Sequence, residues 1–166
     1  DRALRRVLAQ KLELGLLDEG WSPEPLNDGI DFDSAGNRDI ARRMAESSIV
    51  LLDNLAGVLP LQSVQRIAVV GPCAEDPRSF FGCYAFPNHV IPQFPEFDKG
   101  IGIAADSLLT ALRTEFPEAE VHYELGCQVS GGDLSGLQAA VAEARAADVV
   151  VLAVGDRAGL FGNGTS

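Results

Sequence analysis

The most apolar segment of the chain is followed directly by an acidic and a basic residue. The segment DVVVLAVG occupies residues 148–155, and Asp156 and Arg157 come next. A carboxylate accepts hydrogen bonds and a guanidinium donates them, so the pair suits the hydroxyl groups of a polar ligand such as a sugar. A local salt bridge or a turn cap would use the same two residues, and the sequence leaves both interpretations open.

The tail after this segment is rich in glycine. Gly159 and Gly164 have the spacing of the two glycines of a P-loop, but Thr165 stands where the phosphate-contacting lysine belongs. The dinucleotide fingerprint G-x-G-x-x-G is also absent from the chain. The sequence therefore gives only weak support to the hypothesis that the protein is a nucleotide- or phosphate-binding enzyme.

A second group of candidate ligand-binding residues lies in the segment FFGCYAFPNHV, residues 80–90. Tyr84, Asn88 and His89 combine aromatic and hydrogen-bonding groups, which suits a platform for a sugar. Ordinary packing of a loop explains the same composition. The segment belongs to residues 72–100, which show no hydrophobic period and hold five of the nine prolines. An irregular region of this length in a compact domain is often functional.

Other chemistry finds little support in the sequence. There is no Ser/His/Asp set, nucleophile elbow or metal-binding cluster, so we predict no catalytic residue, no metal site and no cofactor in this chain. His122 lies in a predicted strand, which favours a structural role. Cys73, Cys83 and Cys127 form no C-x-x-C motif and are predicted to be buried free thiols.

The elements that would position these residues fall into two parts. Residues 2–17 carry apolar side chains at the spacing of one helix face, and residues 18–36 have acids, Pro and Gly without periodicity, as a linker does. From residue 37 onward helical and strand patterns alternate, which is typical of an α/β fold with a mostly parallel sheet. The expected elements are a helix at 38–53 capped by Ser34 or Asn37, strands at 66–71, 120–124 and 148–155, a helix at 106–116 capped by Asp106 or Ser107, and a helix capped by Asp133.

Glycines mark the ends of the three predicted strands, at Gly71, Gly126 and Gly155. Ligands of open α/β sheets sit beyond the carboxyl ends of the strands, so a site is expected among the segments that follow these glycines. The strand at 148–155 is almost continuously apolar, a pattern that predicts coverage on both faces of the sheet.

Charge and hydropathy argue against two classes of partner. The 166 residues carry a net charge of −11, and the only basic cluster is Arg2, Arg5 and Arg6. Nucleic acids and anionic membranes attract basic surfaces, so neither is expected as a partner. No stretch reaches the roughly 18 apolar residues that a membrane span needs. The oligomeric state stays open.

Several segments together resemble glycoside hydrolase family 3, the β-glucosidase and β-xylosidase family. They are RALRRVLAQKLELGLLD, NRDIARRMAESSIVLLDNLAGVLPL, RIAVVGPCAEDPRSFFGCYAFPNHV and ADVVVLAVGDRAGLFGNGTS, and they cover essentially the whole chain. Family members have a (β/α)8 barrel followed by an α/β sandwich domain. The resemblance therefore implies that residues 1–17 are the last barrel helix, 18–36 the interdomain linker and 37–166 the first part of the sandwich.

The resemblance also implies a retaining β-glycosidase that acts on a small or oligosaccharide β-glycoside. Such enzymes use two carboxyl groups, one as nucleophile and one as acid/base. In this family the nucleophile is an Asp of the barrel and the acid/base is a Glu of the second domain, expected shortly after Ser166. We therefore expect a fragment that is inactive alone, with a non-catalytic α/β ligand-binding module as the alternative. The substrate contacts we expect are Asp156, Arg157, Tyr84 and His89.

Overall fold

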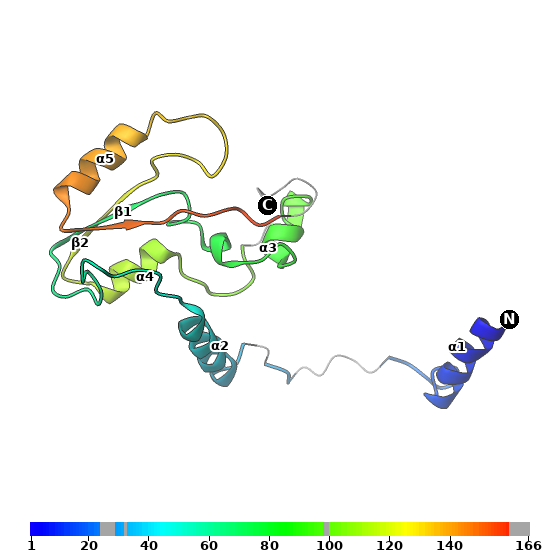
Figure 1. The fold of residues 1–166 in the computed structure, drawn as a ribbon. Coiled ribbons are helices and arrows are strands. Elements are labelled where there is room, and N and C mark those ends of the chain that lie inside the picture. The colour runs from blue at the N-terminus through cyan, green and yellow to red at the C-terminus, as the bar shows by residue number, and fades with distance from the viewer. Residues whose placement is uncertain (24–28, 32, 98–99, 160–166) are drawn as a thin grey trace. The chain divides into compact units, whose positions relative to one another are not determined.

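The computed structural model describes residues 1–23, 29–31, 33–97 and 100–159 (Figure 1). The chain divides into two compact units, Asp1–Asn54 and Leu55–Ser166. The first unit contains the helices α1 and α2, and the second contains a parallel sheet with its covering helices. The expected domain boundary between residues 36 and 37 stays a prediction.

Helix α1 spans Arg2–Glu13 and is about one turn shorter than predicted. Gly15 takes φ +69°, a left-handed conformation that favours glycine. The N–H of Gly15 donates to the Leu12 carbonyl at 3.0 Å, and the N–H of Leu16 donates to the Lys11 carbonyl at 2.9 Å. These are the paired hydrogen bonds of a Schellman motif, which closes the helix at this point. The apolar stripe of α1 is exposed.

Helix α2 spans Ala35–Ser48, so it begins and ends earlier than predicted. Its N-cap is Ser34, whose Oγ accepts a hydrogen bond from the N–H of Asn37 at 3.2 Å. The cap is therefore Ser34 and not Asn37. Beyond the helix the backbone becomes extended at Ile49, with φ −73° and ψ 126°. Ile49 and the residue after it are β-branched, which lowers their helix propensity.

The second unit is built on a three-stranded parallel sheet, which confirms the α/β fold. Its strands are β1 (Arg66–Val70), β2 (Glu120–Glu124) and β3 (Val149–Leu152), in the order β2-β1-β3. In the register of the sheet, Ala68 of β1 lies opposite His122 of β2 and Val150 of β3. The strand β1 is therefore central and its apolar residues are enclosed by a neighbour on each side.

Helices α4 and α5 lie on opposite faces of this sheet (Figure 1). Helix α4 spans Leu108–Glu115, and helix α5 spans Leu137–Ala146 and packs against β1 and β2. The core on the α4 side is apolar and closes tightly around β1. Its buried members are Ile67, Val69, Ala74, Leu109 and Ala153.

The two helices begin differently from one another. Ser107 caps α4, since its Oγ accepts a hydrogen bond from the N–H of Thr110 at 3.1 Å. The predicted cap of α5 is wrong: Asp133 accepts from the N–H of Ser135 at 2.9 Å and stabilises a turn before the helix. Gly136 precedes α5, where a Cβ atom would lie 2.6 Å from a backbone oxygen of Gly126. The close approach of two backbones thus sets the start of α5.

The prediction that the strand at 148–155 is covered on both faces is wrong for the described part of the chain. Strand β3 ends at Leu152, and its residues alternate between half-buried and exposed. Val150 is 44% exposed and Leu152 is 63% exposed. Helix α5 covers β1 and β2 and leaves these β3 side chains open. Among the strands that the structure describes, only the central strand β1 has buried residues facing both ways, at Ile67, Ala68 and Val69.

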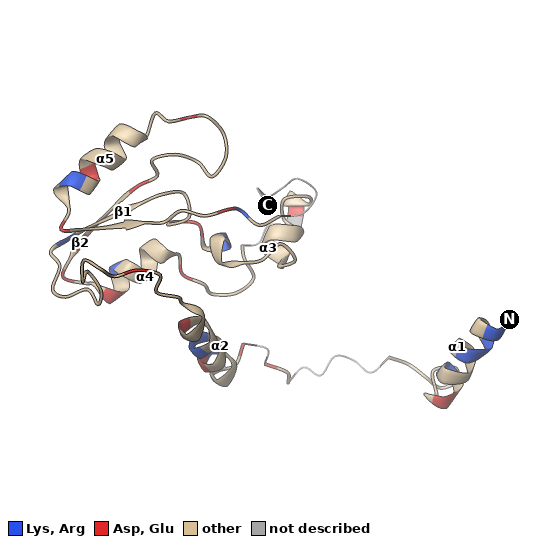
Figure 2. Ribbon diagram, in the orientation of Figure 1, with Lys and Arg blue, Asp and Glu red and all other residues tan. Residues whose placement is uncertain are grey.

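Charged residues tie α5 to the sheet around Arg66 and His122. The guanidinium of Arg66 lies 2.7 Å from Glu143 of α5 and 3.4 Å from Glu120 of β2. His122 lies 3.5 Å from Glu120 and 3.6 Å from Glu143. Figure 2 shows the basic residues of the second unit interspersed with acidic ones rather than gathered on one face. His122 thus sits in a network that joins a helix to two strands.

The region after β1, expected to be irregular, contains three short helical turns among its described residues. They are η1 (Pro77–Phe80), α3 (Phe86–His89) and η2 (Pro95–Phe97). Each has a proline at or near its first position, where the missing N–H costs no hydrogen bond. None of the described helices has the length and hydrophobicity that a membrane span requires.

Candidate functional site

A pocket of about 200 Å³ lies where the loops after β1 and β3 meet. Gly71 ends β1 with φ +122°, and a Cβ atom there would lie 2.3 Å from the carbonyl oxygen of Ala153. The N–H of Cys73 donates to the same carbonyl at 3.2 Å. Only glycine permits this backbone contact, and the contact sets the two loops side by side. The pocket therefore lies at the carboxyl edge of the sheet, where a site is expected.

The carboxylate of Asp76, on the loop after β1, lines the pocket. Asp76 accepts hydrogen bonds from the backbone N–H of Arg78 at 2.9 Å and from its Nε and Nη2 at 3.0 Å and 2.8 Å. Asp76 is also the N-cap of η1, and Pro77 follows it at the first position of the turn. A short Asp-Pro-Arg sequence thus folds back on itself and fixes the carboxylate.

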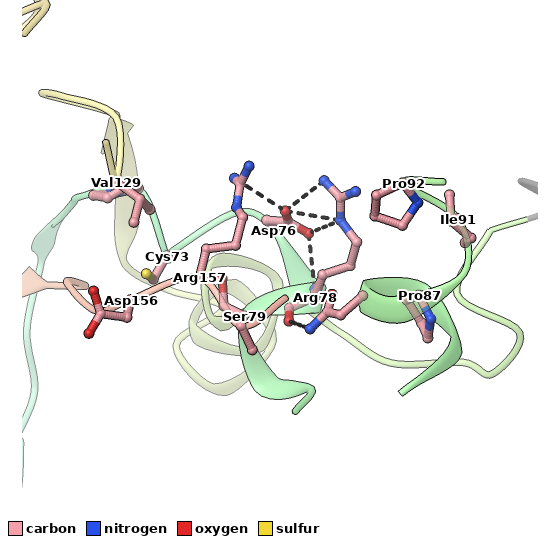
Figure 3. A pocket seen from close by; sticks show the side chains of 13 residues that line it. Cys73, Asp76, Arg78, Ser79, Pro87, Ile91, Pro92, Val129, Asp156 and Arg157 are labelled. Atoms are coloured by element: carbon pink, nitrogen blue, oxygen red, sulfur yellow. Dashed lines mark hydrogen bonds and ion pairs between the residues drawn. The ribbon is translucent and has the colours of Figure 1, made fainter. Parts of the chain in front are cut away.

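Arg157 reaches the same carboxylate from the loop after β3. Its Nη2 lies 4.0 Å from Oδ2 of Asp76, a distance that makes an ion pair but exceeds the length of a hydrogen bond. In Figure 3 the guanidinium groups of Arg78 and Arg157 approach Asp76 from two sides, and the carboxylate of Asp156 points away from them. One acidic side chain therefore links two loops that are far apart in the sequence.

The environment of Asp76 favours its charged form. Partial burial alone would raise the pKa of Asp76, but the hydrogen bonds from Arg78, with the charges of Arg78 and Arg157, outweigh it and lower the pKa below its ordinary value. The carboxylate is consequently an acceptor of hydrogen bonds and a poor donor of protons. A general acid at this site would need the opposite shift.

Asn88 of α3 closes one wall of the pocket. Its side chain is buried, with 6% of its surface exposed, and its amide nitrogen donates to the carbonyl of Phe81 at 2.7 Å and to that of Arg78 at 3.3 Å. These bonds fasten α3 to the turn that carries Arg78. Sequence reasoning placed Asn88 in a candidate loop without assigning it this role. It missed Asp76 and Arg78, for which the Asp-Pro-Arg turn was the available signal.

The structure places two of the four predicted contact residues at the pocket. Asp156 and Arg157 line it, whereas Tyr84 and His89 do not. The rings of Tyr84 and His89 lie 5.8 Å apart at an angle of 32°, and Tyr84 is 80% exposed. The roles of all four in ligand binding stay predictions. The Gly-rich tail beyond Gly159, including Gly164 and Thr165, lies outside the described residues.

Metal and disulfide chemistry find no support among the described residues. No group of three or more His, Cys, Asp or Glu side chains in that part of the chain could hold a metal ion. Cys73, Cys83 and Cys127 are free thiols, and all three are half-buried rather than buried. Cys73 lines the pocket, where a Cβ on Gly155 would lie 3.4 Å from its sulfur.

Comparison with known proteins assigns the chain to a family. Residues 49–165 match the glycosyl hydrolase family 3 C-terminal domain. The chain belongs to glycosyl hydrolase family 3. The matched region contains the described sheet and every residue that lines the pocket.

The curated relatives of this family 3 chain include xylosidases and a glucosidase. The chain is 29% identical to a β-xylosidase of Formosa agariphila over 99% of its length, and 32% identical to β-D-xylosidase 3 of Arabidopsis thaliana over 93%. It is 29% identical to a periplasmic β-glucosidase of Salmonella typhimurium over 96% of its length. The chain spans about a fifth of the length of these relatives.

A solved family 3 structure has a similar fold. It is an exo-β-xylosidase in complex with a xylobiose aziridine activity-based probe, with a TM-score of 0.52 and 25% identity. The similarity covers 72% of this chain and 14% of that one. The family match and the solved structure both agree with the α/β fold and with the resemblance found in the sequence.

Proposed function

We propose that this chain forms part of the substrate site of a retaining β-glycosidase of family 3, which hydrolyses terminal β-linked glucose or xylose. The observation that carries the proposal is the pocket in which Asp156 and Arg157 lie together beyond the ends of parallel strands. The Asp156 carboxylate can accept hydrogen bonds and the Arg157 guanidinium can donate them, and because the two side chains point in different directions (Figure 3) they would contact different hydroxyl groups of a bound sugar. The names of the relatives support a glycoside as ligand.

In this proposal the catalytic carboxyl groups come from outside the chain. A retaining mechanism needs a nucleophile and an acid/base about 5–5.5 Å apart. Asp76 and Asp156 are the carboxylates that line the described pocket. The pKa of Asp76 is lowered, so Asp76 is unsuited to donate a proton. The single remaining carboxylate cannot perform both steps, and the chain alone is accordingly expected to be inactive.

Tyr84 and His89 fit the proposal as an outer platform and not as walls of the pocket. Their rings are near neighbours on the loop that also carries Asn88, and the exposed face of Tyr84 is accessible to a ligand. Aromatic faces pack against the apolar faces of sugar rings while hydroxyls bind polar groups nearby. A second sugar or an aglycone is the part of the substrate that we assign to them.

The test uses the full-length enzyme that contains this chain, with aryl β-glucosides and β-xylosides as substrates. Arg157→Ala is expected to lower kcat/KM by a factor of about 5–150, the equivalent of about 1–3 kcal/mol for a charged hydrogen bond. Arg145→Ala, which removes the same side chain from the exposed last turn of α5, is the matched control and should leave kcat/KM unchanged.

Three outcomes separate the hypotheses. Hydrolysis by the full-length protein, none by the 166-residue chain, and loss only in Arg157→Ala would support the proposal. Steady hydrolysis by the pure chain, abolished by Asp156→Asn, would show that this pocket holds catalytic groups. Binding of xylose or glucose by the full-length protein without hydrolysis would favour a non-catalytic ligand-binding module.

A further inference from the structure

Asp76 carries different contacts to the two arginines that approach it. Arg78 makes hydrogen bonds to both carboxylate oxygens, at 2.8–3.1 Å, and its backbone N–H adds a further bond at 2.9 Å. Arg157 makes an ion pair at 4.0 Å. The first set is directional and holds the carboxylate in place, whereas the second attracts a charge without fixing its hydrogen-bond geometry.

This asymmetry has a consequence for Arg157. A guanidinium on a long side chain has many rotamers, and ordering it on binding costs conformational entropy. A fixed negative charge beside the pocket reduces that cost, because it selects the rotamers that point toward the pocket. Since Asp76 and Arg157 share no direct hydrogen bond, the guanidinium can shift toward a ligand without breaking one with Asp76.

We propose that Asp76 is a positioning residue, which Arg78 fixes in place and which orients Arg157 over the pocket for contact with a sugar hydroxyl. The proposal rests on the proposed function, in which Arg157 contacts substrate. The side chain of Asp76 is 22% exposed and that of Arg157 is 51% exposed, as expected for an anchored group and a group that faces a ligand. The low pKa of Asp76 supports the proposal, because the carboxylate keeps its charge across the neutral range.

The competing explanation is purely structural. Asp76 caps η1, so its loss could disturb the pocket without any specific effect on Arg157. Asp76→Asn separates the two, because its one side-chain oxygen still accepts the cap hydrogen bond from the N–H of Arg78, whereas the negative charge and the second acceptor oxygen are lost. A cap alone survives this substitution, and the attraction for Arg157 does not.

The experiment is a double-mutant cycle in the full-length enzyme, with KM and kcat measured separately for Asp76→Asn, Arg157→Ala and the double variant. We expect Asp76→Asn to raise KM about two- to tenfold in the wild-type background and to have no further effect once Arg157 is alanine. A single cooperative thermal transition is the check that the variant folds, although the loss of the Asp76 charge is expected to lower its melting temperature. Arg78→Gln, which releases Asp76 from its anchor, should raise KM in the same background-dependent way if Asp76→Asn does not fold.

Each alternative result is decisive. If Arg157→Ala leaves kcat/KM unchanged, the proposed function of Arg157 fails and the positioning role fails with it. If Arg157→Ala lowers kcat/KM but Asp76→Asn has no effect, or the same effect in both backgrounds, the proposed function stands and Asp76 has only a structural role.

Discussion

A Cβ atom on Gly71 would lie 2.3 Å from the carbonyl oxygen of Ala153, so these two residues touch backbone to backbone where β1 and β3 end. Gly71 also takes φ +122°, which residues with a side chain rarely adopt. A larger residue at this position would therefore clash with the carbonyl of Ala153 and would also strain the backbone. For both reasons Gly71 is the position around the pocket that we expect to tolerate substitution least.

Gly71→Ala is expected to lower the free energy of unfolding by about 2–4 kcal/mol, since it adds backbone strain and a clash with backbone that cannot move aside. Urea unfolding of the purified protein measures the change. Gly82→Ala is the matched control, because no atom lies within 4 Å of a Cβ built on Gly82, apart from its chain neighbours. Equal stability of the two variants would show that the strand ends can separate without cost.

Asn88→Ala is expected to destabilise the protein by about 1–3 kcal/mol, because it removes part-buried hydrogen bonds from a buried side chain to the carbonyl groups of Phe81 and Arg78. It should also lower kcat/KM in the full-length enzyme, since the turn that carries Arg78 loses its brace. Gln138→Ala removes an exposed amide from α5 and serves as the control. A loss of stability without a change in kcat/KM would show that the hydrogen bonds of Asn88 stabilise the fold but do not affect the substrate site.

The charge of Asp76 predicts a pH dependence of stability. Because its pKa is lower in the folded protein than in the unfolded chain, ionised Asp76 stabilises the fold above the ordinary Asp pKa of about 3.9. This contribution is lost as the pH falls through the lowered pKa, where the carboxylate becomes protonated in both states. The difference in unfolding free energy between wild type and Asp76→Asn should therefore be present at pH 7 and shrink toward pH 2. A difference that is constant with pH would contradict this assignment.

The apolar stripe of α1 predicts weak protection of that helix in the isolated chain. No residue of Arg2–Glu13 is buried in the described structure, and helices of this length are marginal in water without a packing partner. Hydrogen exchange should be fast across α1 and slow in β1, where Ile67, Ala68 and Val69 are buried. The family resemblance predicts that α1 packs on a barrel domain. Slow exchange across α1 in a monodisperse monomer would instead show that its partner lies within this chain.

The strands were predictable because their signals are local. The apolar β-branched run at Arg66–Val70 ends at Gly71, and the run at Val149–Leu152 follows a helical pattern. Helix ends were less predictable, since they depend on which of several polar residues makes a hydrogen bond. Asp133 has the right type for a cap of α5, but it bonds to Ser135 in a turn instead. The close approach of Gly136 and Gly126, which decides the start of α5, requires knowledge of the tertiary structure.

The residues of the candidate site also differ in how well the sequence predicts them. Asp156 and Arg157 were found because they follow a buried strand directly, and the rule that ligands bind at the carboxyl ends of strands applies to them. Asp76 could not be ranked from the sequence, because its importance comes from a contact with Arg157 that only the sheet brings about. Tyr84 and His89 have suitable chemistry but do not line the pocket, whereas their neighbour Asn88 does.

The strand order β2-β1-β3 has a consequence for the evolution of this pocket. The chain passes from β1 to β2 on one side and then returns across β1 to β3 on the other, so the direction of winding reverses at β1. Such a topological switch point leaves a crevice outside the strands whatever residues fill the loops. The connectivity of the chain therefore determines where the pocket lies. Its loops are free to diverge in length and composition without moving the pocket itself.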